Sequence, residues 1–153
     1  MTSRTNATLC VGGVVLRERE VLLVRQAEGH DLEGQWTFPW GFVDPTESPA
    51  EAVVRETLEE AGVHAEVEGI IGVQELPRSG WLGIVYLCRA MSGDPQPDGR
   101  EVDLAGFFGL AALDEMGSSV EPWSEWVVRR VLAGRTSVLG PSDQPYAPRR
   151  GFF

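Results

Sequence analysis

The chain has 153 residues, which is enough for one domain with a full hydrophobic core. Its formal charge of −10 argues against non-specific binding to nucleic acid or to an anionic membrane, because both require a basic surface. No apolar run approaches the length of a membrane span, and the first nine residues lack a signal-peptide core. We therefore expect a cytoplasmic protein with a single domain over residues 1–153.

Apolar runs separated by turn residues predict the strands. In chain order these runs are 9–16, 21–26, an alternating aromatic run at Trp36, Phe38 and Trp40, 65–75, 81–90 and 101–110. The first two are joined by a charged turn at 17–20, and 65–75 and 81–90 read as a hairpin. Pro39 interrupts the aromatic run and restricts it to a sheet edge or a bulge.

The first predicted helix lies between the aromatic run and the hairpin. Ser48 can cap it, Pro49 suits its first position, and Glu51 follows the cap by three residues. Gly62 is where a helix of this length would end. Its mostly apolar face contains Ala50, Val53, Val54, Thr57, Leu58 and Ala61.

Glu56, Glu59 and Glu60 are expected together on the opposite face of this helix, because residues three and four apart are neighbours. Such a charge run is usually a solvated surface, and Arg55 lies one helical step from Glu51 and from Glu59. The alternative is a site for a hard divalent cation, which prefers carboxylate and carbonyl oxygens. The helix alone leaves both interpretations open.

The last third of the chain predicts a helical turn at 111–116 and an amphipathic helix at 121–134. The residues near one side of this helix are Trp123, Trp126, Val127, Arg130 and Val131. Residues 136–153 are expected to form a docked or mobile C-terminal tail. Strands, a helix, more strands and a terminal helix together predict an α/β (α+β) fold with a mixed sheet between helices.

Residues 41–63 carry a longer pattern that decides between the two interpretations of the glutamates. The pattern is Gly, five residues, Glu, seven residues, Arg-Glu, an apolar position, any residue, Glu-Glu, any residue, Gly and an apolar position. It is filled by Gly41, Glu47, Arg55, Glu56, Thr57, Glu59, Glu60, Gly62 and Val63. This stretch resembles the signature of the Nudix hydrolases, the MutT-like family. Thr57 departs from the usual aliphatic residue, and Trp40 stands where a second glycine is common.

The resemblance implies an α/β/α sandwich and Mg²⁺-dependent hydrolysis of a phosphoanhydride bond, with Mn²⁺ as an alternative ion. The implied metal ligands are the backbone carbonyl of Gly41 and the carboxylates of Glu56, Glu59 and Glu60. Arg55 is expected to orient a carboxylate through charge-assisted hydrogen bonds, and it joins Glu56 and Glu59 as an expected catalytic residue.

A further acidic residue often completes such sites, six residues before an aromatic that opens a strand. Phe107 takes the aromatic position, so Glu101 is the expected catalytic residue and Asp103 is its rival. Trp36 and Trp40 are the candidates for substrate binding by stacking on a base, although core packing is the commoner use of tryptophan.

The expected substrate is a small-molecule nucleotide, either a nucleoside triphosphate or a nucleoside diphosphate derivative such as ADP-ribose. An acidic chain suits a polyphosphate only if metal ions supply positive charge. A homodimer is left open. The alternative function is a regulatory Nudix module that binds nucleotides without catalysis, but the complete set of signature glutamates favours an enzyme.

Overall fold

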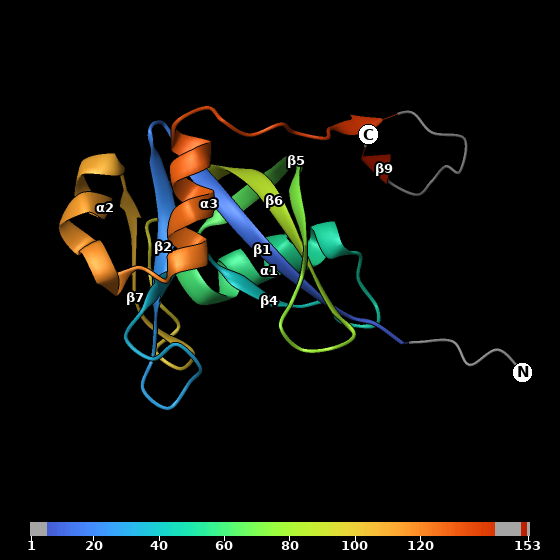
Figure 1. Cartoon of the computed structure of the whole chain (residues 1–153), viewed down its shortest axis with the longest axis horizontal. Helices are drawn as coiled ribbons and strands as arrows, with labels where there is room; N and C mark the ends of the chain where they lie inside the picture. The colour runs from blue at the N-terminus through green and yellow to red at the C-terminus, as the bar shows by residue number, and fades with distance from the viewer. Residues whose placement is uncertain (1–5, 143–150, 153) are drawn as a thin grey trace, which may run out of the picture.

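A mixed sheet forms the centre of the computed structural model, which describes residues 6–142 and 151–152 (Figure 1). The strands are β1 (Thr8–Arg17), β2 (Glu20–Gln26), β3 (Trp36–Thr37), β4 (Trp40–Phe42), β5 (His64–Glu75), β6 (Trp81–Ser92) and β7 (Val102–Phe108). Five run in the order β3-β2-β1-β6-β5, while β4 pairs with β1 and β7 pairs with β2. The pairing of β1 with β6 is parallel, and the hairpin of β5 and β6 is antiparallel.

Helix α1 (Pro49–Ala61) covers one face of this sheet and α3 (Pro122–Leu132) covers the other (Figure 1). Val11 and Leu22 join the core on the α1 side, whereas Val14 and Leu23 join the core on the α3 side. Strands buried on both faces read as nearly continuous apolar runs, which is why β1 and β2 are visible in the sequence. The predicted α/β (α+β) fold, with a mixed sheet between helices, is confirmed.

The termini of α1 are the predicted ones. Ser48 and Glu51 form a reciprocal capping box, in which each side chain accepts a hydrogen bond from the other residue's backbone N–H. Gly62 ends the helix in the left-handed conformation, with φ of 66°, which glycine adopts without steric cost. Local chemistry therefore fixes where this helix begins and ends.

The predicted faces of α1 are partly wrong. Leu58, expected on the apolar face, is 39% exposed, whereas Glu60, expected on the opposite face, is only 4% exposed. The reason is that β4 lies against this part of the helix. The backbone N–H of Trp40 donates a 3.1 Å hydrogen bond to Oε2 of Glu60. One of the three carboxylates predicted on the polar face is therefore buried beneath a strand.

The aromatic run does not form one strand, because it changes partner at Pro39. Residues before it belong to β3, which pairs with β2, and residues after it belong to β4, which pairs with β1. Pro39 has no N–H to donate, and its carbonyl accepts a 2.9 Å hydrogen bond from Gly13. Phe38 points into the α3-side core, at 1% exposed, and Trp36 packs against the same core.

Helix α2 (Leu110–Met116) precedes a 3₁₀ turn (Gly117–Ser119) and α3. The carboxylate of Glu121 caps α3 by accepting hydrogen bonds from the backbone N–H groups of residues 123 and 124. The buried face of α3 consists of Ser124, Val127, Val128 and Val131. Trp126 is 59% exposed and Arg130 is exposed beside it, so the side predicted for this helix is only partly the buried one.

Part of the predicted tail docks on the sheet. Ile70 of β5 and Leu139 exchange two backbone hydrogen bonds of 3.0 and 2.9 Å. Two short strands follow, β8 (Pro141–Ser142) and β9 (Gly151–Phe152), and they pair with each other. The rest of the tail, residues 143–150 and 153, lies outside the described residues. Within the described part of the chain, none of the helices has the length and apolarity needed to cross a membrane.

Candidate active site

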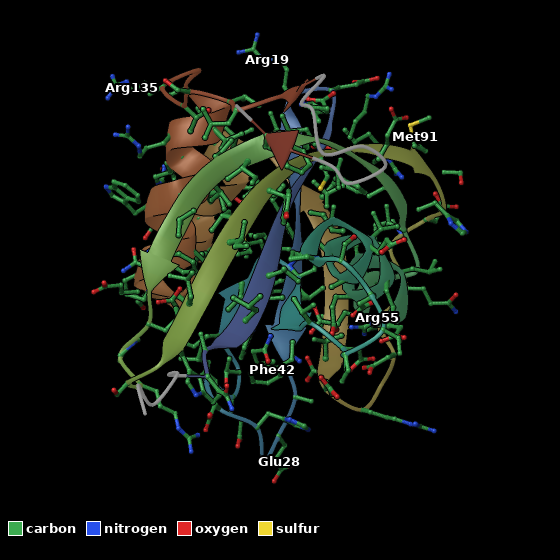
Figure 2. All side chains as sticks on the ribbon, turned by 90° about the vertical axis from the view of Figure 1, so that its right-hand side faces the viewer. Arg19, Glu28, Phe42, Arg55, Met91 and Arg135 are labelled. Atoms are coloured by element: carbon green, nitrogen blue, oxygen red, sulfur yellow. The ribbon has the colours of Figure 1, made fainter. Side chains whose placement is uncertain are left out.

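Arg55 is the centre of a network that joins α1 to the loop before it (Figure 2). Its Nε and Nη2 donate to the two carboxylate oxygens of Glu47, at 3.0 and 2.7 Å. Its Nη1 donates to Glu56 at 2.9 Å and to Glu59 at 3.0 Å, and Nη2 also reaches the carbonyl of Phe42 at 3.0 Å. All three guanidinium nitrogens are therefore committed to protein acceptors.

Glu47 holds the loop that precedes α1. Besides the fork to Arg55, its Oε1 accepts a 2.9 Å hydrogen bond from the backbone N–H of Asp44. Hydrogen bonds from Arg55, with the Asp44 N–H second, keep the pKa of Glu47 below its usual range. An ionised Glu47 thus fixes both the loop and the guanidinium that orients the other carboxylates.

Gly41 lies directly against the carboxyl group of Glu56. The antiparallel register of β4 on β1 places Gly41 opposite Val11, facing α1. A Cβ atom at position 41 would overlap the carboxyl carbon and both carboxyl oxygens of Glu56. Only glycine permits this close approach of strand and side chain.

Glu56 and Glu60 are carboxylates in an environment that disfavours their charge. Burial raises the pKa of Glu60 to about 9, the Trp40 N–H opposes this, and the charges of Glu56, Glu101 and Asp98 add to it. Burial also raises the pKa of Glu56, against the hydrogen bond and charge of Arg55. These two groups need positive charge beyond that of Arg55 if both are to be ionised.

Glu101 lies close enough to this pair for its charge to raise the pKa of both Glu56 and Glu60. Its position is set by Asp98, whose Oδ1 accepts hydrogen bonds from the backbone N–H groups of residues 100, 101 and 102 at 2.9–3.1 Å. The carbonyl of Glu101 also accepts from Ala27 at 2.9 Å. Asp98 was not among the sequence candidates, although an aspartate before glycine in a turn is a known local signal.

Asp103, the rival of Glu101, is engaged elsewhere. Its two carboxylate oxygens accept from Nε and Nη2 of Arg25, both at 2.8 Å. Arg25 lies on β2, next to β7 in the sheet. The structure therefore brings Glu101 near Glu56 and Glu60, and gives Asp103 an ion pair with Arg25.

Comparison with known proteins agrees with this geometry. The model of the NUDIX domain matches residues 7–127, most of the chain. The chain belongs to the Nudix family. A Nudix hydrolase from Nitrosomonas europaea has the same fold, with a TM-score of 0.76 and 25% identity over 87% of this chain and 74% of that one.

Two curated relatives carry named activities. The human 8-oxo-dGDP phosphatase NUDT18 is 40% identical over 91 residues, which are 59% of this chain and 28% of that protein. The ADP-ribose pyrophosphatase of Methanocaldococcus jannaschii is 30% identical over 112 residues, which are 71% of this chain and 65% of that protein. The chain thus spans less than two thirds of the length of either Nudix relative.

The donor set of this Nudix site fits a hard divalent cation such as Mg²⁺ or Mn²⁺. Carboxylates from one helix face and a backbone carbonyl at residue 41 are the oxygen ligands that such ions prefer. Within residues 6–142 and 151–152, no three acidic, histidine or cysteine side chains are grouped as metal ligands. Instead, the Arg55 guanidinium occupies the space between Glu56 and Glu59 and supplies the positive charge there.

The two tryptophans predicted to bind substrate lie in different places. Trp36 packs edge-on against Phe108, with ring centroids 5.0 Å apart, and belongs to the α3-side core. Trp40 lies beside Gly41 and begins a chain of aromatic contacts, with Phe42 at 6.1 Å and then Trp81 at 5.1 Å from Phe42. Phe42 is 43% exposed, so this row presents an exposed ring at the end of β4, before the loop that leads to α1 (Figure 2).

Proposed function

We propose that this Nudix domain hydrolyses a phosphoanhydride bond in a nucleoside diphosphate derivative or a nucleoside triphosphate, with Mg²⁺ or Mn²⁺ as cofactor. The observation that carries the proposal is the Arg55 network, which gathers Glu47, Glu56 and Glu59 beside Gly41 of β4. A solvated helix face would need neither the buried carboxylate of Glu60 nor a glycine pressed against Glu56.

The metal, when bound, supplies a Lewis acid that neutralises phosphate oxygens and lowers the pKa of water. Gly41, Glu56, Glu59 and Glu60 would hold it. Their crowding is favourable for this task, since burial and mutual repulsion raise the pKa of Glu56 and Glu60 and leave both short of positive charge.

Arg55 acts in this proposal as a positioning residue. Because its guanidinium is occupied by Glu47, Glu56, Glu59 and a backbone carbonyl, it orients carboxylates and does not reach out to substrate. Glu101 is the proposed general base. It comes from a separate loop, its backbone N–H is held by a hydrogen bond to Asp98, and its charge acts on the same cluster.

The substrate class follows from what the relatives' names share. One is named for 8-oxo-dGDP and the other for ADP-ribose, and both compounds contain a diphosphate joined to a nucleoside. We propose the same linkage here, cut so that a nucleoside monophosphate is released. The row of Trp40, Phe42 and Trp81 is the proposed surface for the attached group. A cytoplasmic location remains part of the proposal, and a homodimer remains an open prediction.

The test is product analysis on ADP-ribose, 8-oxo-dGDP and nucleoside triphosphates with Mg²⁺, with Mn²⁺ and with a chelator. We expect metal-dependent release of a nucleoside monophosphate, and its loss in Glu56→Gln. The alternative of a regulatory module predicts tight nucleotide binding with no product under any condition. Turnover restricted to a diphosphate without a nucleoside would overturn the substrate class but leave the metal site standing.

A further inference from the structure

A groove outside the candidate active site lies between α3 and β5. Its volume is about 370 Å³, within the range of pockets that hold small molecules. Trp123, Trp126, Arg130, Arg135 and Gln74 contribute to its walls, and no acidic residue is among the described residues that line it. A lining with two arginines and no acidic residue stands out in a chain with a formal charge of −10.

The aromatic and basic groups of this groove are held together. The guanidinium of Arg130 lies 4.8 Å from the ring centroid of Trp126, as in a cation–π contact. Its Nη2 donates to the carbonyl of Arg135 at 3.0 Å, and the Arg135 N–H donates to the carbonyl of Arg130 at 2.8 Å. The ring of Trp126 nevertheless remains 59% exposed.

The charges of Arg130 and Arg135 are not neutralised within residues 6–142 and 151–152, where neither forms an ion pair. Their neighbour Arg129 shows the contrast, because it pairs with Asp114 and Glu125, both at 2.8 Å. One guanidinium bond to a carbonyl leaves Arg130 further N–H donors. The groove therefore offers free guanidinium donors of Arg130 beside an indole ring that Arg130 covers only in part, and Arg135 adds a second cationic residue to the lining.

We propose that this groove binds a free nucleoside monophosphate, with the base stacked on Trp126 and the phosphate held by Arg130 and Arg135. An aromatic ring accepts any base, and arginine matches a phosphate in charge and geometry. The volume suits one nucleotide rather than a polymer. The polar side chains of Gln74 and Thr136 complete the wall with groups that can bond to a ribose or base.

This site is distinct from the catalytic cluster. The groove lies on the face of the sheet that α3 covers, whereas Arg55 and its carboxylates lie on the α1 face. Figure 2 shows Arg135 at the upper left of the molecule and Arg55 at the lower right. Binding at the groove requires no metal, because the protein itself provides the positive charge. The proposal does not rest on the proposed function.

The test is calorimetric titration of the full chain with AMP in a metal chelator, so that the acidic active site lacks its cation. We expect AMP to bind at least about tenfold more tightly than adenosine or inorganic phosphate, since stacking and charge act together. Trp126→Ala should weaken AMP binding roughly tenfold, and Arg130→Gln and Arg135→Gln at least about fivefold each. Arg19→Gln, which removes an exposed arginine outside the groove, is the matched control and should change nothing.

Three outcomes would overturn the proposal. The first is AMP affinity that all three groove variants leave unchanged. The second is equal affinity for AMP and inorganic phosphate, which indicates a simple anion site. The third is tighter binding of a short single-stranded oligonucleotide than of AMP.

Trp126→Phe keeps an aromatic ring at this exposed position and should retain most of the affinity, which separates stacking from loss of fold. Metal-dependent hydrolysis at low substrate should be the same in every variant, because none of these residues touches the catalytic cluster.

Discussion

Replacing Gly41 by alanine should separate activity from stability at the candidate active site. The added methyl group would overlap the carboxyl group of Glu56. Since that carboxyl group is the end of a flexible side chain, Glu56 can rotate away instead of forcing the strand to move. Rotation breaks the 2.9 Å ion pair between Glu56 and Arg55. The damage therefore falls on the carboxylate geometry rather than on the core.

The expected cost in stability is small. Loss of one partly exposed ion pair removes about 1 kcal/mol or less, and a strained rotamer of Glu56 adds about 1 kcal/mol. Together they lower the melting temperature by roughly 3–6 °C for a chain of this size. Activity should fall much further, by about 100-fold, because a misplacement of about 1 Å at a catalytic group has an effect of that order.

The measurement pairs thermal unfolding with steady-state kinetics in Mg²⁺. Gly29→Ala is the matched control, because Gly29 lies on an exposed loop, has a φ of 85° and has no neighbouring atom for the new methyl group to meet. It carries a similar or larger backbone cost without touching Glu56, and should keep its activity. In the double variant Gly41→Ala/Glu56→Gln, the losses of activity of the two single substitutions should not add, because both substitutions act on the carboxylate of Glu56. Full activity in Gly41→Ala, or additive losses in the double variant, would refute the reasoning.

Three further predictions follow from the same site. Glu60→Gln should abolish most metal-dependent hydrolysis. The metal-free protein should be as stable or slightly more stable, because the substitution removes a buried carboxylate near Glu101. Full activity in a kinetic assay would contradict this prediction. Glu101→Gln should lower kcat by about 100-fold or more with little change in KM, as for a general base. Asp103→Asn should mainly weaken the ion pair to β2 and so lower the melting temperature. If Asp103→Asn lowers kcat and Glu101→Gln lowers only the melting temperature, the two residues exchange roles. Trp40→Gly should alter relative rates across a nucleotide panel more than the metal dependence, and unchanged relative rates would count against substrate contact.

The sequence predicted best those features that local chemistry controls. Ser48, Pro49 and Gly62 determine the limits of α1 through capping and backbone preference, and the structure has the helix at Pro49–Ala61. The strands that are buried on both faces of the sheet are also visible in the sequence as apolar runs, because each residue carries its own preference for burial. No knowledge of distant contacts was needed for either.

Features that depend on distant contacts were missed or misplaced. Helical periodicity placed Leu58 on the apolar face and Glu60 on the opposite face, because it could not include the strand that covers Glu60. The change of partner at Pro39 likewise depends on two different strands, β1 and β2. In both cases the deciding contact joins residues that are far apart in the sequence. Asp98 is different, because its hydrogen bonds to residues 100–102 are local and an aspartate before glycine could have indicated the turn.

The carboxylate cluster is also where local stability and the proposed chemistry place opposite demands on the same residues. A buried Glu60, a crowded Glu56 and a glycine inside β4 each weaken the fold relative to an apolar alternative. Sequences commonly retain such costs where function requires them. The two apolar cores supply the stability that offsets them, and Arg55 limits the repulsion without removing it. This balance explains why substitutions that neutralise a carboxylate are expected to preserve or strengthen the fold while removing activity.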